Sequence, residues 1–150
     1  MIRYVTGFMF SDNLQNVALI SKIKPAWQKG LLNGVGGKIE HSETAEEAMA
    51  REFMEETGVN TNPEDWKLYT ILSRPDEYEV NFFYMRDDRV YSVRTIEKEK
   101  VDVYQSNFLP DKVIWNLRWL IPLAQDSALQ FSQPLRIYEK IAGSVTTLME

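Results

Sequence analysis

The chain contains 150 residues, of which 44% are hydrophobic, and it has no cysteine. This length predicts one domain over residues 1–150 with a sizeable core, and the composition excludes a disordered or disulfide-stabilised chain. The net charge of −5 argues against binding of a nucleic-acid duplex. The apolar runs are too short to span a membrane and no signal-peptide pattern is present, so we expect a cytoplasmic protein that does not contact membranes.

In chain order, the first predicted elements are two strands over residues 3–10 and 17–23, joined by a polar turn. A glycine-rich turn over residues 34–37 follows them. Glycine lets the backbone approach a ligand closely, and free backbone amides in such a turn can point toward phosphate oxygens. The turn is therefore a candidate phosphate-binding element.

Residues 45–57 carry the signals of a helix at both ends. Thr44 and Glu47 have the spacing of a capping box, and Gly58 provides a C-terminal stop. On a helical wheel, the apolar stripe that should face the core is formed by Ala45, Ala48, Met49 and Phe53. We therefore expect an amphipathic helix over this range.

Three acidic residues lie where this helix should bury apolar side chains. Glu52 and Glu56 fall inside the apolar stripe, and Glu55 lies at its edge. Like charges one turn apart repel each other, and partial burial raises the cost unless a cation neutralises them. Mg²⁺ takes oxygen ligands at short range. The segment therefore predicts a metal site on a helix, which together with the glycine turn suits a phosphate ester bridged by Mg²⁺.

The second half of the chain contains weaker patterns. We expect, in order, a hairpin, a charged loop or weak strand, two short strands and a C-terminal helix, over residues 66–85, 86–100, 101–104, 117–121 and 133–148. The turn of the hairpin covers residues 74–77 and contains Pro75, and helical spacing of apolar residues supports the last helix.

Residues 37–59 read G-x5-E-x7-R-E-F-x-E-E-x-G-V and match the Nudix box without a departure. On this pattern the chain resembles the Nudix hydrolases. The resemblance implies an α/β/α sandwich with a mixed β-sheet. It also implies hydrolysis of the phosphoanhydride bond of a nucleoside diphosphate linked to a group X, with Mg²⁺ or Mn²⁺ as the cofactor.

The resemblance also assigns roles to the acidic residues of the box. Glu52 and Glu56 would bind the metal, and Glu55 beside them would bind it directly or through water. A backbone carbonyl of the glycine turn, from Gly36 or Gly37, would complete the ligand set. The alternative for the whole set is an ordinary solvated helix face.

Two further charged groups have roles by the same resemblance. Arg51 and Glu43 would form an ion pair that holds the loop against the helix. A carboxylate outside the box would serve as the catalytic base or an extra ligand, and Glu99 is preferred over Glu97 because it comes just before a predicted strand. Both acids can equally be surface residues.

Substrate contacts are expected around the run from Asn33 to Lys38. Asn33 resembles a base-contacting asparagine of the oxidised-purine triphosphatases in the family, and Gly36, Gly37 and Lys38 would also bind the substrate. An Asn-Gly pair is also common in turns. Trp27 could stack on a base or pack at the rim. Weaker candidates, each with an ordinary structural explanation, are Lys22, Lys24, Trp119 and Asp126.

These residues favour hydrolysis of a ribo- or deoxyribonucleoside triphosphate, including an oxidised purine nucleotide, to the monophosphate and pyrophosphate. The alternative is a pyrophosphatase for ADP-ribose or another nucleoside diphosphate sugar, because Pro75 lies 16 residues after Val59, a spacing that resembles the ADP-ribose pyrophosphatases. A non-catalytic nucleotide-binding module would be expected to lose box acids, and none is missing. We expect a small nucleotide as the partner and a monomer or homodimer.

Overall fold

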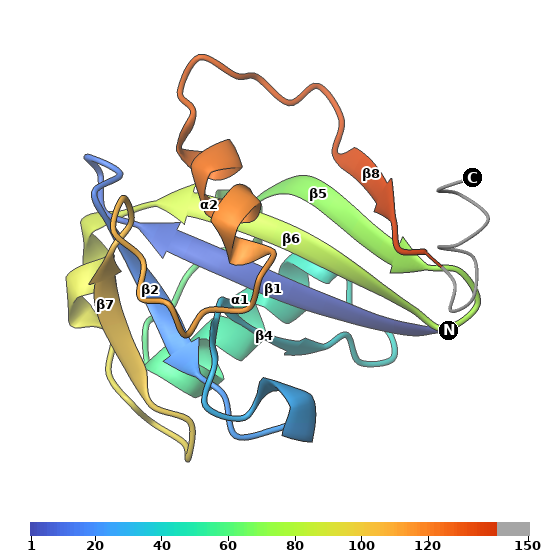
Figure 1. The fold of residues 1–150 in the computed structure, drawn as a ribbon, viewed down its shortest axis with the longest axis horizontal. Helices are drawn as coiled ribbons and strands as arrows, with labels where there is room; N and C mark the ends of the chain where they lie inside the picture. Colours follow the sequence, from blue (N-terminus) through green and yellow to red (C-terminus); the bar gives the residue numbers. More distant parts are fainter. Residues whose placement is uncertain (141–150) are drawn as a thin grey trace.

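A mixed sheet of eight strands lies at the centre of the structure, a computed structural model that describes residues 1–140 (Figure 1). Its strand order is β3-β2-β1-β6-β5-β8, with β4 paired to β1 and β7 paired to β2. The strands are β1 (Ile2–Phe10), β2 (Asn16–Ser21), β3 (Leu32–Asn33), β4 (Val35–Lys38), β5 (Lys67–Arg74), β6 (Tyr78–Arg86), β7 (Val101–Gln105) and β8 (Leu135–Tyr138).

The central strand β1 pairs with β6 in parallel and with β4 in the antiparallel direction. From Val5 to Phe10 it is buried without interruption. Alternate side chains of a strand point to opposite faces, so continuous burial means that both faces of the sheet are covered.

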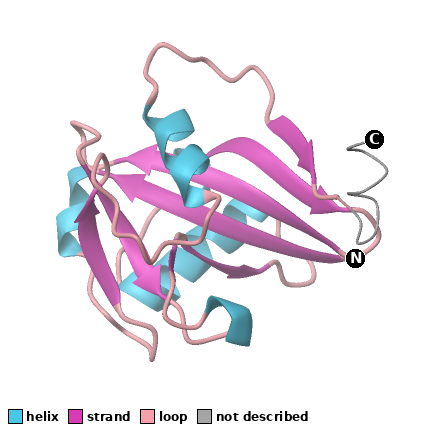
Figure 2. Ribbon diagram, viewed as in Figure 1, coloured by secondary structure: helices cyan, strands magenta, loops and turns pink. Residues whose placement is uncertain are grey.

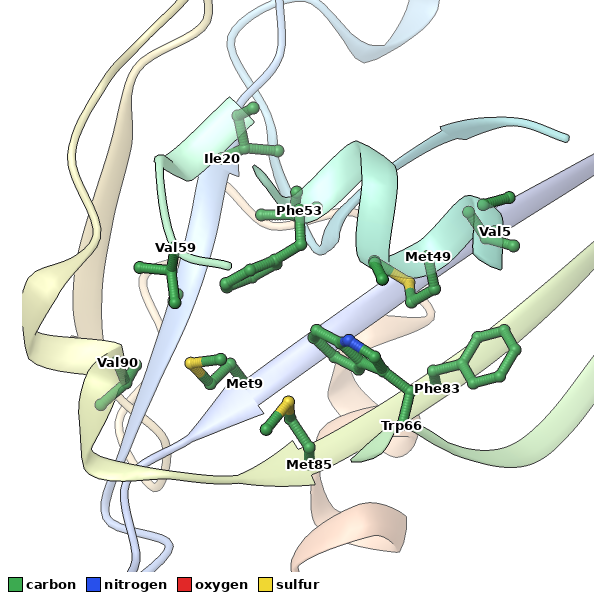
Figure 3. Packing of buried hydrophobic residues seen from close by; sticks show 14 of the residues in the cluster. Val5, Met9, Ile20, Met49, Phe53, Val59, Trp66, Phe83, Met85 and Val90 are labelled. Carbon is green, nitrogen blue, oxygen red and sulfur yellow. The ribbon is translucent and has the colours of Figure 1, made fainter. Parts of the chain in front are cut away.

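Two helices provide this cover, one on each face (Figure 2). Helix α1 (Ala45–Thr57) packs Met49 and Phe53 against Met9 of β1, and Figure 3 shows these side chains beside Trp66. Helix α2 (Leu117–Gln125) packs on the other face, against a second cluster that contains Phe8. This arrangement confirms the α/β/α sandwich with a mixed sheet. Short 3₁₀ helices cover Ala26–Gln28, Pro63–Asp65 and Asp88–Ser92.

The predictions that depend on residues close together in the sequence, namely the ends of α1 and the hairpin, are confirmed. Helix α1 begins and ends as expected: Thr44 Oγ1 accepts from the Glu47 amide at 3.1 Å, and Gly58 ends the helix with φ = 77°. The Glu47 carboxylate accepts in return from the Thr44 amide at 2.9 Å, which completes the capping box. The predicted hairpin is also present, with β5 and β6 joined at residues 74–77.

Two predictions near the C-terminus are wrong within the described residues. The strand expected over 117–121 is instead the start of α2, because Leu117, Leu120 and Ile121 are buried at helical spacing against the sheet. The helix expected over 133–148 begins in a region that forms β8, parallel to β5. Leu135 and Tyr138, two of the apolar residues whose helical spacing supported that prediction, are exposed. Residues 141–148 of that prediction lie outside the described residues.

The glycine-rich segment is a strand and not the flexible turn expected. Residues 35–38 form β4 and pair with β1 from Gly7 to Tyr4. A Cβ atom at Gly36 would collide with the carbonyl oxygen of Val5. Glycine is needed here because two backbones approach each other closely, a contact that the linear sequence does not reveal.

Candidate active site

Helix α1 lies against β4, and this contact brings the box acids next to the glycine strand. A Cβ atom at Gly37 would collide with the Glu52 carboxylate, so the glycine leaves room for that side chain. Lys38 follows at the end of β4, and its carbonyl oxygen accepts from Arg51 Nη2 at 3.0 Å. The strand and the helix therefore present backbone carbonyls and carboxylates to one place.

The ion pair expected between Arg51 and Glu43 is present. Arg51 Nε lies 2.6 Å from Glu43 Oε2, and Nη2 lies 2.9 Å from Oε1, which is a bidentate arrangement. The hydrogen bond from Arg51 holds the pKa of Glu43 below its usual range. Arg51 Nη1 also reaches Glu52 Oε1 at 2.9 Å and Glu55 Oε2 at 3.2 Å. One guanidinium thus links the loop, the glycine strand and the acidic face of α1.

Single Arg51→Ala and Glu43→Ala variants are expected to lower kcat/KM by about 10- to 100-fold, as for other residues that orient metal ligands. The double variant should lose little more than either single variant, because both changes break the same pair. Steady-state kinetics of the four proteins in the cycle measure this. The exposed pair Arg3–Glu79, 3.0 Å apart, is the matched control and should leave activity unchanged. Additive losses at Arg51 and Glu43 would show that the pair has no joint role.

Glu52 and Glu56 are acids whose charged forms the protein itself disfavours. Burial raises the pKa of Glu52. Burial, followed by repulsion from Glu97, Glu52 and Glu99, raises the pKa of Glu56 to about 7. Glu56 Oε2 is buried and has no hydrogen-bond partner among the described residues. A buried carboxylate oxygen without a donor needs a cation or a proton as its partner.

The donor set fits a divalent ion that completes its coordination with substrate and water. Residues 1–140 contain no group of three or more acidic, histidine or cysteine side chains placed to hold a metal unaided. Mg²⁺ usually binds one or two carboxylates together with waters and substrate phosphates. Glu52 and Glu56 are two carboxylates of this kind, Gly37 lies against Glu52, and Glu55 lies half exposed beside it.

The two candidate acids outside the box have different surroundings. Glu99 accepts from Lys22 Nζ at 3.0 Å and from the amides of Ile23 and Lys24 at 2.6 and 3.2 Å. Burial opposes ionisation, but these hydrogen bonds leave the pKa of Glu99 below its usual value. Its carboxylate therefore holds the segment after β2. Glu97 is exposed and is the charged residue that repels Glu56 most strongly.

A cavity of about 620 Å³ opens beside the glycine strand on the face of the sheet that α2 covers. Asn33, Gly36, Gly37 and Trp27 line it. Asn33 Oδ1 accepts from the Gly34 amide at 2.8 Å, and Nδ2 donates to Gln28 Oε1 at 3.3 Å. Trp27 is 69% exposed, so its indole is available at the rim. The structure brings these predicted residues together around one space.

Asn116 also lines this cavity, although it was not among the predicted site residues. Its Oδ1 is buried and has no hydrogen-bond partner among the described residues. The position of this asparagine directly before an apolar segment could have indicated the start of a helix, but a strand was predicted there. Of the weaker candidates, Trp119 packs against the α2 core, Asp126 accepts from the Ala128 amide at 3.1 Å, and Lys24 is exposed.

No helix within residues 1–140 has the length and apolar character needed to cross a membrane. A search among curated proteins found no match. Solved structures do resemble this chain. A MutT Nudix hydrolase from Burkholderia pseudomallei has a TM-score of 0.65 and 18% identity, covering 81% of this chain and 95% of that one. An ADP-ribose pyrophosphatase from Streptococcus suis has a TM-score of 0.62 and 14% identity, covering 92% and 98%.

A MutT/Nudix family protein from Enterococcus faecalis has a TM-score of 0.58 and 19% identity over 69% of this chain, which spans only 43% of that protein's length. At such identities these likenesses show the fold alone. The family model described as the NUDIX domain matches residues 2–123, which is most of the chain and includes the box helix, the glycine strand and most of α2. The chain therefore belongs to the Nudix family, whose hydrolases act on phosphoanhydride bonds.

Proposed function

We propose that this protein hydrolyses nucleoside triphosphates, with ribose or deoxyribose and including oxidised purine nucleotides, to the monophosphate and pyrophosphate in a reaction that requires a divalent metal. The observation that carries the proposal is the cavity beside the glycine strand: Asn33 and Asn116 line it together with Gly37, and Gly37 also lies against the Glu52 carboxylate of α1. Members of the Nudix family typically depend on a divalent metal and act on small nucleotides. The cavity and the acidic face of α1 therefore suit a nucleotide whose phosphates lie at α1.

Glu52, Glu56 and a carbonyl of Gly36 or Gly37 would hold Mg²⁺ or Mn²⁺. Such an ion polarises phosphoryl oxygens and makes a bound water more acidic. The ion pair of Arg51 keeps Glu52 and the loop in place, so that the carboxylates meet the substrate in a fixed arrangement. The exposed carboxylate of Glu97 would take the proton of the attacking water, since Glu99 is occupied by its own three donors.

Two amides are available to recognise the base. Asn116 offers a buried acceptor without a partner among the described residues, and Asn33 keeps capacity for one further hydrogen bond on each side-chain atom. Leu72, Val80 and Phe82 supply apolar walls, which suit the faces of a planar ring. Trp27 can cover the ring from the rim.

The decisive experiment is hydrolysis of a nucleotide panel in Mg²⁺, with products separated by chromatography. The proposal predicts a nucleoside monophosphate and pyrophosphate from the common and 8-oxo deoxyribonucleoside triphosphates, with kcat/KM above that for ADP-ribose. Preference for ADP-ribose over every triphosphate would favour the second candidate, which the fold likeness to an ADP-ribose pyrophosphatase supports. Pro75 adds little to that candidate because it lies in the turn between β5 and β6. Tight binding without turnover would indicate a non-catalytic module.

Asn33→Ala is expected to raise KM and to flatten the preference among bases, because a lost pair of contacts to a base edge changes discrimination by about 1–3 kcal/mol. Kinetics with four triphosphates measure this, together with the melting temperature. Gln28→Ala is the matched control, since it removes the hydrogen bond to Asn33 but leaves the Asn33 side chain. A loss of stability with unchanged base preference would mean that Asn33 only holds the backbone at Gly34, between β3 and β4.

A further inference from the structure

The residues that line the cavity extend across the sheet from β4 to Glu139, which follows β8. Figure 1 shows where these two strands lie in the sheet. Neighbouring strands along this path are β4, β1, β6, β5 and β8. Four spacings of about 4.8 Å separate the two ends by about 19 Å. Gly36 lines one end of the cavity and Glu139 lines the other. The far end is therefore well away from the box acids.

This far end carries a polar pair that the proposed chemistry does not use. The hydroxyl of Tyr78, at the start of β6, donates to Oε2 of Glu139. The Glu139 amide donates to the Ser73 carbonyl at 2.9 Å, which fixes the backbone next to β5. Burial and this hydrogen bond raise the pKa of Tyr78 to about 12, so its hydroxyl remains a donor at neutral pH. Glu139 Oε1 has no donor among residues 1–140.

The walls between the two ends favour a base in this part of the cavity. Leu72, Val80, Phe82 and Ile114 line it and present apolar surface, which suits a flat ring better than a sugar. A carboxylate at the end of such a slot only accepts hydrogen bonds. It therefore favours a base edge with adjacent donors, such as the N1–H and 2-amino groups of guanine. It disfavours adenine, which places an acceptor at N1 beside its amino group.

We propose that Glu139, positioned by Tyr78, selects a guanine-type base at the β8 end of the cavity. The sugar and phosphates then point toward β4, where Asn33 lines the cavity, so a base at Glu139 and a base at Asn33 are alternative positions. A change of base preference in Asn33→Ala without one in Glu139→Gln would place the base at Asn33 and overturn the role of Glu139. The inference rests on the proposed function, because it needs a nucleotide in the cavity. Glu139 lies beyond residues 2–123, the segment that the family model matches, whereas Tyr78 lies within it.

The test compares kcat/KM for dGTP, dITP and dATP in Mg²⁺, using the full chain. The wild type should prefer dGTP, followed by dITP, which lacks the 2-amino group, and then dATP. Glu139→Gln should change the dGTP/dATP ratio by about tenfold or more, mainly through KM. Activity on dATP should rise, because an amide offers the donor and acceptor that match adenine. Loss of a merely structural residue would lower both activities together.

Two further variants support the interpretation. Tyr78→Phe should reduce the preference for dGTP through KM with kcat unchanged, and it provides a second test if the Glu139→Gln variant is unstable. Glu79→Gln is the matched control: its carboxylate pairs with Arg3, and adjacent residues of β6 point to opposite faces. It should leave the ratio unchanged.

The two proposals fail in different ways. If the wild type hydrolyses triphosphates but the dGTP/dATP ratio is the same in Glu139→Gln, Tyr78→Phe and the wild type, the role of Glu139 is overturned and the hydrolase proposal remains. An equal loss of activity on all three nucleotides in Glu139→Gln would also overturn the role of Glu139 and leave the hydrolase proposal in place. If the wild type hydrolyses no triphosphate, both proposals are wrong.

Discussion

Replacing Glu56 with glutamine is expected to lower kcat by about 100-fold or more while the protein remains folded. The buried Oε2 of this residue has no partner among the described residues, which makes it the box oxygen best suited to a metal ligand. An amide has the same shape but a much weaker attraction for a cation. Steady-state kinetics with saturating Mg²⁺ measure the loss. Turnover within threefold of the wild type would argue against Glu56 as a ligand.

The same substitution should stabilise the metal-free protein, and only at neutral or higher pH. A pKa raised from 4.5 to about 7 means that the folded state holds the proton more tightly than the unfolded state. The stabilising contribution of Glu56 is therefore complete below about pH 4.5 and is lost as the pH rises through about 7. Glutamine has no proton to lose, so the two proteins should differ in stability at about pH 8 but not at about pH 4.5.

The stability gained by Glu56→Gln is limited because the Glu56 side chain is partly exposed to solvent. The shift corresponds to about 3 kcal/mol, and solvent screening of a partly exposed side chain reduces the expected gain to about 1 kcal/mol. Melting temperatures in EDTA should then differ by about 2–4 °C at about pH 8. Glu46→Gln, in the first turn of the same helix, is the control and should show no such pH-dependent gain. Equal melting temperatures at that pH would mean that Glu56 is not strained in the free protein.

The sequence predicted the parts of the site that depend on local signals. The ends of α1 follow from the capping box at Thr44 and from Gly58, each read within a few residues. The acids of α1 were identifiable because they interrupt an apolar stripe of fixed period. The pairing of Arg51 with Glu43 was predicted from the family resemblance. The two residues are only eight positions apart, so both belong to the same sequence motif.

The parts that were missed depend on contacts between distant segments. The glycine segment forms a strand because β1 lies beside it, and the short run that begins at Leu117 forms a helix because it covers the sheet. Asn116 reaches the cavity only through that packing. The preference for Glu99 over Glu97 rested on position in the chain and stays a prediction; the contacts of Glu99 with Lys22 and two backbone amides could not be foreseen from the sequence.

Removal of divalent metal is expected to abolish hydrolysis. Glu52 and Glu56 are partly buried one turn apart on α1, and the cations that lower their pKa values are Arg51 for Glu52 and Lys22 for Glu56. Without a cation, the phosphates of the substrate would add further negative charge at this place and bind poorly. Activity measured with Mg²⁺ should fall to background in excess EDTA and return when Mg²⁺ or Mn²⁺ is restored. Full turnover in excess EDTA would contradict the proposed mechanism.

A second measurement separates metal binding from catalysis. A ligand that binds only the folded state raises the melting temperature, by an amount that grows with the ratio of its concentration to Kd. Mg²⁺ should therefore stabilise the wild type, and more at about pH 8 than at about pH 5, because Glu56 must lose its proton to bind the ion. Glu56→Gln should lose most of this stabilisation, whereas Glu46→Gln should retain it. Equal stabilisation of all three proteins by Mg²⁺ would place the metal site elsewhere.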